Sequence, residues 1–159
     1  MELYLLRHGI AEDRSETGRD ADRRLTVEGR HKLESILERA YAAGVAPTAI
    51  FASPLRRALE TAELAARGLG YEGRIVRTEA LLPESSPQAV WNFLREHASE
   101  TSVLLAGHEP LFSATVAYFL GSMRSMVHFR KGALVRIDFE SGRSAPEGFL
   151  QWMITAKLA

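Results

Sequence analysis

The sequence L-Y-L-L-R-H-G at residues 3–9 decides the fold, because it joins an apolar run to polar side chains at the end of that run. A short apolar run predicts a buried β-strand, and Arg7, His8 and Gly9 then lie where the strand ends. In an open α/β sheet, ligands bind at the carboxyl ends of the strands. The stretch therefore predicts a candidate site, although a surface loop that carries Arg and His fits these three residues equally well.

The composition describes one ordinary globular domain. The chain has 159 residues, of which 46% are hydrophobic and 25% are charged, and this length is enough to bury a core. The 20 Lys and Arg residues balance the 20 Asp and Glu residues, so no overall field favours nucleic acid or an anionic membrane. We expect a single domain over residues 1–159, no nucleic-acid or membrane partner, and only local recognition of anions.

The chain contains no cysteine, which excludes disulfides, thiolate catalysis and cysteine-based zinc sites. The N-terminal apolar run is too short for a signal peptide, and no run of 18 apolar residues predicts a transmembrane helix. We therefore expect a cytoplasmic protein. The sequence does not indicate the oligomeric state.

Strand and helix patterns alternate along most of the chain. Short apolar or alternating runs predict further strands at residues 49–52, 74–78, 102–107, 133–139 and 148–155, with a turn at 140–142 before the last. Helical spacing predicts helices that begin after Thr26, at Ser53-Pro54, at Ser86-Pro87 and at Pro110. This alternation predicts a three-layer α/β/α sandwich with a mostly parallel central sheet and an antiparallel hairpin at one edge.

Three strand ends carry polar residues that a parallel sheet would bring to one edge: residues 7–9, 53–57 and 107–108. They carry two imidazoles and three guanidiniums, and two imidazoles with two guanidiniums suit a tetrahedral dianion such as phosphate. The polar segment 10–24 has no helical or strand period and predicts a long loop over the first strand end. Arg19, Asp20, Asp22 and Arg23 of this loop could form part of the rim.

Helical spacing separates the two arginines of the second strand end. Arg56 shares a helix face with three charged residues, Glu60, Glu63 and Arg67, which predicts a solvated stripe. Arg57 lies between that stripe and the apolar face, and its side chain tilts toward the helix N-terminus, where the strand edge should be. We therefore expect Arg57, rather than Arg56, at the site.

The motifs resemble the histidine phosphatase (phosphoglycerate mutase-like) superfamily, branch 1. They occur in that family's order: Leu6-Arg7-His8-Gly9, Leu25-Thr26 with Gly29, Ser53 to Ala58 with Thr61-Ala62, and Gly107-His108. Only 50 residues separate Arg57 from His108, which is most similar to the short SixA-type phosphohistidine phosphatases that lack a large cap insertion. The resemblance implies a phosphoglycerate mutase-like fold without such a cap.

The resemblance also implies the roles of individual residues. His8 would be the nucleophile and would be phosphorylated transiently, while Arg7, Arg57 and His108 would hold the phosphoryl oxygens. We also assign Gly9 and Arg19 to substrate binding. Neighbouring guanidiniums fit these roles, because they lower the pKa of the attacking imidazole and stabilise charge on the phosphoryl oxygens. The resemblance implies no metal and no cofactor.

The general acid is not assigned by the sequence. Glu79 and Glu84 are the candidates between the second arginine motif and the second histidine, and plain surface charge is an equal interpretation of both. A phosphohistidine substrate has less need of an acid, because imidazole is a far weaker base than an alkoxide. His31 and His97 fall on predicted helices and are expected to be structural or exposed, whereas His128 could border the site.

The favoured function is a metal-independent phosphatase that dephosphorylates phosphohistidine in a protein such as a phosphotransfer domain, in a signalling role. The nearest alternative is a phosphatase of small phosphomonoesters, such as a sugar phosphate or a nucleotide. A non-catalytic phosphate-binding module is a second alternative. A zinc hydrolase built on His8 and His108 is poorly supported, since the chain has no HExxH helix and neighbouring arginines would repel a cation.

Overall fold

A computed structural model of the chain describes residues 1–122, 127–140 and 145–157. In these residues, six strands form one mixed sheet in the order β3-β2-β4-β1-β5-β6. The strands are β1 (Glu2–Arg7), β2 (Ala49–Ala52), β3 (Val76–Arg77), β4 (Ser102–Gly107), β5 (Leu134–Phe139) and β6 (Gly148–Ile154). The first four in sequence run parallel, and β5 and β6 form an antiparallel hairpin at one edge.

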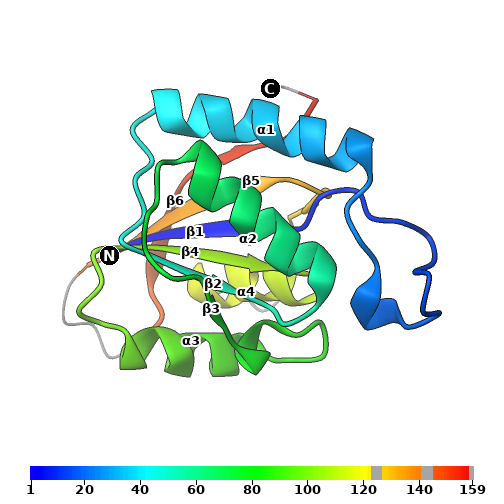
Figure 1. The fold of residues 1–159 in the computed structure, drawn as a ribbon. Coiled ribbons are helices and arrows are strands. Elements are labelled where there is room, and N and C mark those ends of the chain that lie inside the picture. The colour runs from blue at the N-terminus through cyan, green and yellow to red at the C-terminus, as the bar shows by residue number, and fades with distance from the viewer. Residues whose placement is uncertain (123–126, 141–144, 158–159) are drawn as a thin grey trace.

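Helices cover both faces of the sheet (Figure 1). They are α1 (Val27–Ala42), α2 (Arg56–Gly68), α3 (Pro87–Glu96) and α4 (Leu111–Phe119), with short 3-10 turns η1 (Asp20–Asp22) and η2 (Glu79–Leu81). One apolar cluster joins the sheet to α1 and α2, and a second joins its other face to α3 and α4. The predicted α/β/α sandwich is therefore confirmed. Among the described residues, no helix is long and apolar enough to cross a membrane.

The opening strand is buried on both faces. Leu3 and Leu5 pack into the cluster beneath α3 and α4, whereas Tyr4 and Leu6 pack into the cluster beneath α1 and α2. All four side chains have no exposed surface. Because helices cover both faces, β1 needs apolar residues at every position instead of an alternating pattern. This is why residues 3–6 form a continuous apolar run.

Two close approaches hold the start of α1 against the chain that follows β1. A methyl group on Gly29 would overlap the backbone of Ile10, and one on Gly9 would lie 2.7 Å from Cδ1 of Leu33. Thr26 caps α1 as predicted, since its side chain accepts a hydrogen bond from the amide of Gly29 at 3.0 Å. The glycines therefore let α1 cross directly beside the segment that carries His8.

The start of α2 and the extent of β3 differ from the sequence prediction. The helix begins at Arg56 with Leu55 at the N-cap, so Ser53 and Pro54 precede it. The predicted strand at 74–78 shrinks to Val76–Arg77, since only these two residues pair with β2 and both are exposed. The other cap prediction, Ser86 before Pro87, is confirmed. Residues 141 and 142 of the predicted turn at 140–142 lie outside the described residues.

Candidate active site

The three polar strand ends meet at one edge of the sheet. Strand β4 lies between β1 and β2, and Arg7 of β1 is in register with Gly107 of β4. The amide of His8 donates to the carbonyl of Gly107 at 3.0 Å, and the amide of Ser53 donates to the carbonyl of Ala106 at 2.9 Å. Parallel pairing therefore brings His8, His108 and Ser53 next to one another.

His8 is a buried, neutral imidazole with a fixed tautomer. Its Nδ1 lies 2.8 Å from the carbonyl oxygen of Gly9, and since a carbonyl only accepts, Nδ1 carries the hydrogen. Burial is the largest cause that lowers the pKa of His8, and together with the positive charges of Arg57, Arg7 and Lys131 it brings that pKa to about 4 against the opposing effect of the Gly9 hydrogen bond. At neutral pH, Nε2 therefore keeps an unprotonated lone pair.

His108 faces His8 across the site. The two ring centroids are 5.0 Å apart and the ring planes are tilted by 53°. Nε2 of His108 lies 2.8 Å from Oγ of Ser53, and its Nδ1 is buried without a partner among the described residues. Burial, followed by His8 and Arg57, lowers the pKa of His108 to about 3. The second imidazole is thus also neutral at physiological pH.

Arg57 turns into the site, whereas Arg56 lies on the outer face of α2. The Arg57 side chain is 7% exposed, and its Nη1 donates to the carbonyl oxygen of Asp20 at 3.0 Å while Nη2 lies 3.1 Å from the Asp20 carboxylate. The Arg56 side chain is 44% exposed and pairs with Glu60 at 3.1 Å. Thr61 fixes the first turn of α2 to the end of β1, since its Oγ1 donates to the Arg57 carbonyl and accepts from the Gly9 amide.

Arg7 supplies a second guanidinium. Its Nη1 donates to the carbonyl oxygen of Phe129 at 2.5 Å, and its Nε is buried without a partner among the described residues. Burial lowers the pKa of Arg7 and the nearby carboxylate of Glu109 opposes this shift. The main chain before β5 therefore orients this cation and leaves donors of its fork available.

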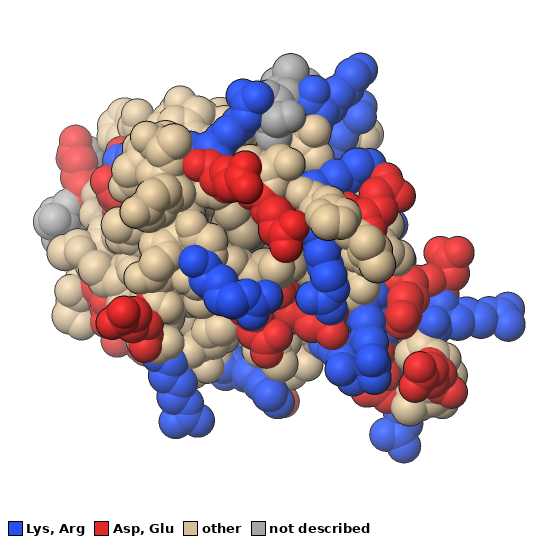
Figure 2. All heavy atoms as spheres, turned by 45° about the horizontal axis from the view of Figure 1, so that its top comes forward, with Lys and Arg blue, Asp and Glu red and all other residues tan. Residues whose placement is uncertain are grey.

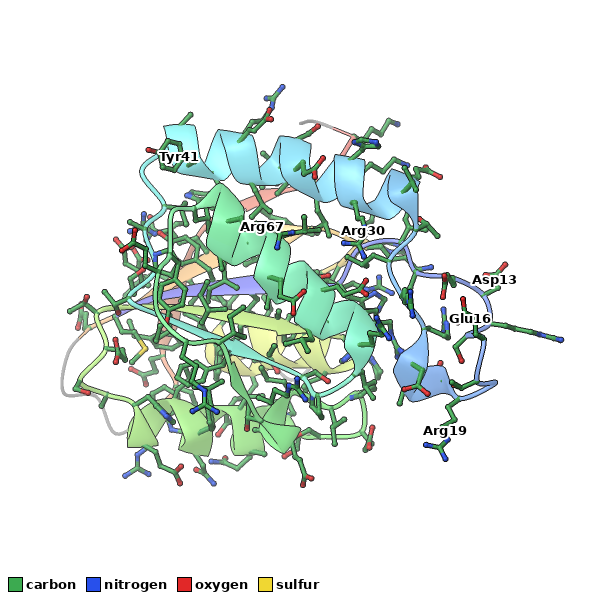
Figure 3. The ribbon with its side chains drawn as sticks, viewed as in Figure 1. Asp13, Glu16, Arg19, Arg30, Tyr41 and Arg67 are labelled. Carbon is green, nitrogen blue, oxygen red and sulfur yellow. The ribbon has the colours of Figure 1, made fainter. Side chains whose placement is uncertain are left out.

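Glu60 corrects one sequence prediction. The helical pattern places it on a solvated stripe, yet it is 8% exposed. Its Oε2 accepts from the amide of Leu25 at 2.9 Å and from Arg30 at 2.7 Å, and Arg30 lies on the side of α1 that faces α2 (Figure 3). Glu60 thus ties the end of the 10–24 loop and α1 to α2. The periodicity of α2 alone could not predict the burial of Glu60, because Leu25 and Arg30, which contact it, belong to another segment.

Three of the predicted residues form no hydrogen bond or ion pair with the cluster. Arg19 is exposed, and its side chain projects from the η1 region into solvent (Figure 3). Glu79 and Glu84 are exposed and form no side-chain hydrogen bond or ion pair with a described residue. His31 and His97 are exposed or structural, as expected. His31 pairs with Glu34 on the surface of α1, and Nδ1 of His97 donates to a backbone carbonyl at the end of α3.

Three residues near the site make contacts that the sequence did not predict. Ser53 contacts His108 instead of capping a helix, and Asp20, a suggested rim residue, occupies the fork of Arg57. Glu109 follows His108 directly and accepts hydrogen bonds from the amide and hydroxyl of Ser113. A polar residue next to a strand end was the available signal for Ser53 and Glu109, whereas the contact of Asp20 depends on the path of the loop.

The arrangement suits a phosphoryl group. A neutral imidazole with a free Nε2 can attack phosphorus, while Arg7 and Arg57 supply charge-assisted donors to the phosphoryl oxygens. Within residues 1–122, 127–140 and 145–157, no group of three or more His, Asp or Glu side chains is arranged to hold a metal ion.

Sequence comparisons identify related proteins. Residues 3–86 match the model of the histidine phosphatase superfamily (branch 1). A protein from Picosynechococcus sp. (strain ATCC 27264 / PCC 7002 / PR-6) is 39% identical over 113 residues, which cover 69% of this chain and 67% of that protein.

Solved structures share the fold. The protein histidine phosphatase SixA, complexed with tungstate, superposes with a TM-score of 0.89 at 22% identity, over 99% of this chain and 98% of that chain. A mutant phosphoserine phosphatase from Entamoeba histolytica in complex with phosphoserine superposes with a TM-score of 0.72 at 13% identity, over 98% of both chains. The expected phosphoglycerate mutase-like fold is therefore confirmed.

Proposed function

The chain belongs to the histidine phosphatase superfamily, branch 1, and is a phosphatase of that superfamily; we propose that it transfers phosphoryl groups through His8 and acts on phosphohistidine in a protein. The observation that carries this proposal is the buried His8, whose Nδ1 hydrogen is held by the Gly9 carbonyl so that Nε2 is left as the nucleophile. Arg7 and Arg57 flank it as cations.

The proposed reaction has two displacements at phosphorus. In the first, Nε2 of His8 forms a bond to phosphorus while the bond from phosphorus to the substrate imidazole breaks, and that imidazole leaves with the electron pair and takes up a proton. In the second, the oxygen of a water molecule forms a bond to phosphorus while the bond from phosphorus to Nε2 of His8 breaks. Nε2 recovers the electron pair, and the hydrogens of the water leave with the inorganic phosphate. Arg7, Arg57 and His108 hold the three phosphoryl oxygens in both steps, where charge builds up in the transition state.

Phosphohistidine is favoured because neither Glu79 nor Glu84 forms a side-chain hydrogen bond with a described residue that would hold it at the site as a general acid. An alkoxide leaving group needs a carboxylic acid within hydrogen-bond reach, whereas imidazole leaves without strong acid assistance. The likeness in fold to a protein histidine phosphatase agrees with this substrate. The likeness to a phosphoserine phosphatase keeps small phosphate esters as the second candidate. The proposal also includes the cytoplasmic location, signalling role and single uncapped domain expected from the sequence.

The test is hydrolysis of a histidine-phosphorylated phosphotransfer protein, and of a panel of phosphomonoesters, in excess chelator. Wild type should release phosphate from the phosphoprotein, and His8→Ala should lose several orders of magnitude in rate. His31→Ala is the matched control, since His31 is an exposed histidine of α1 outside the site. Equal rates for wild type and His8→Ala would refute the mechanism, and a chelator-sensitive rate would favour the zinc alternative. Turnover of phosphomonoesters alone would refute the phosphohistidine substrate.

A further inference from the structure

A groove of about 660 Å³ with one sign of charge opens beside the active site. Arg7 lies in its wall, so the groove continues directly from the phosphoryl site. Its other ionisable lining residues are Lys32 from α1, His128, Arg130 and Lys131 from the segment before β5, and Lys157 after β6. No Asp or Glu is among the described lining residues.

This one-sided charge is unusual for this chain. The formal net charge is zero, and acidic and basic side chains are interspersed over the face that α1 and α2 form (Figure 2). In the groove, Lys32 pairs with Glu28 of its own helix. The side chains of Arg130, Lys131 and Lys157 are exposed and make no ion pair with any residue that the structure describes. Three cations are therefore available to a ligand.

We propose that this basic groove docks an acidic segment beside the phosphohistidine of the protein substrate. The inference rests on the proposed function and adds to it a charge requirement on the partner. Arg7 would hold the phosphoryl group at one end of the groove, while Arg130, Lys131 and Lys157 contact Asp or Glu side chains of the flanking segment.

The kind of cation in the groove favours an extended acidic chain over a second small anion. Compact phosphate sites use oriented guanidiniums that are held in place by the protein, and Arg7 and Arg57 already provide these. The groove instead offers exposed, flexible side chains from several segments, which is the arrangement that steers and orients a charged protein partner. Lys131 is close enough to His8 to help lower the pKa of that imidazole, so the docking charges lie within electrostatic reach of the reacting group.

The test compares two synthetic peptides of equal length, each with one phosphohistidine, flanked in one case by Asp residues and in the other by Ser residues. At low ionic strength, wild type should show a kcat/KM about tenfold higher for the acidic peptide, because three surface ion pairs together reach about that factor. The ratio should shrink toward one in concentrated salt, which screens exposed charges. The measured quantity is the ratio of the two kcat/KM values, because a general loss of activity lowers both values and leaves their ratio unchanged.

The decisive variant is Arg130→Glu/Lys157→Glu, in which the acidic-to-neutral ratio should fall to about one or below, since attraction becomes repulsion. The matched control is Arg67→Glu/Arg95→Glu, which reverses two exposed cations outside the groove and should keep the wild-type ratio. A ratio of one in wild type, or a ratio that survives the groove variant, would overturn the inference while leaving the proposed function intact. A small bisphosphate that is hydrolysed better than the acidic peptide, with the same loss in the groove variant, would also overturn it.

Absence of hydrolysis with both peptides would count against the proposed function instead. In that case the docking surface is tested separately, by measuring the binding of the unphosphorylated peptides with fluorescence anisotropy. Tighter binding of the Asp peptide than of the Ser peptide, lost in Arg130→Glu/Lys157→Glu, supports the docking surface. Equal binding of the two peptides refutes it.

Discussion

Removing the negative charge of Asp20 should strengthen phosphate binding. In the free protein, Asp20 occupies the fork of Arg57 through its carbonyl oxygen at 3.0 Å and its carboxylate at 3.1 Å. A phosphoryl group that binds Arg57 must displace or share these contacts. The Asp20 side chain is 62% exposed, so its ion pair contributes no more than about 1 kcal/mol. Loss of that competition should therefore improve phosphate affinity by about two- to fivefold.

The variant is Asp20→Asn, which keeps the shape of the side chain and the carbonyl contact. The assay is the competitive inhibition constant of inorganic phosphate at low ionic strength, which should fall by that factor. The control is Asp22→Asn in the same η1 turn, since Asp22 accepts a hydrogen bond from Thr17 and does not contact Arg57. An unchanged or higher inhibition constant for Asp20→Asn would refute the reasoning, as would an equal fall in both variants.

Three other perturbations test the site and the contacts that support it. Arg57→Ala should lower kcat/KM about 100-fold or more and Arg56→Ala only slightly, since one preorganised charge donor is worth about that much; equal losses in steady-state assays would contradict the two-face assignment. His8 should stay neutral from pH 7 down to about pH 5 in NMR titrations of its ring, because burial lowers its pKa to about 4. Between pH 6.5 and 4 the unfolded chain then binds a proton that the folded chain does not, so acidification through this window should lower the free energy of unfolding, and less so in His8→Asn. Glu60→Ala should cost about 2 kcal/mol in urea unfolding, because the buried amide of Leu25 and the guanidinium of Arg30 lose their acceptor; a cost near zero would show that water replaces the carboxylate.

Local sequence signals predicted the elements well where they have a strong physical basis. The apolar run at 3–6, the caps at Thr26 and Ser86 and the strand at 102–107 all appear in the structure. The local signals failed where contacts between distant segments decide whether an element forms. The strand at 74–78 is cut to two residues because it lies at the sheet edge and pairs only with β2. Ser53 does not cap α2, which begins at Arg56, and its hydroxyl instead contacts His108 at 2.8 Å and accepts a hydrogen bond from the Leu55 amide at 3.3 Å.

The sequence by itself predicted the fold class, the family through the resemblance of its motifs, and four residues that the structure brings together: Arg7, His8, Arg57 and His108. These depend on local order: polar residues that directly follow buried parallel strands must meet at one edge of the sheet. Only the tertiary structure decided how the cluster is held. The contact of Asp20 with Arg57, the contact of Ser53 with His108 and the burial of Glu60 join segments far apart in the chain. The basic groove is likewise lined by cations from separate segments. Periodicity within one segment cannot predict that these cations share a surface.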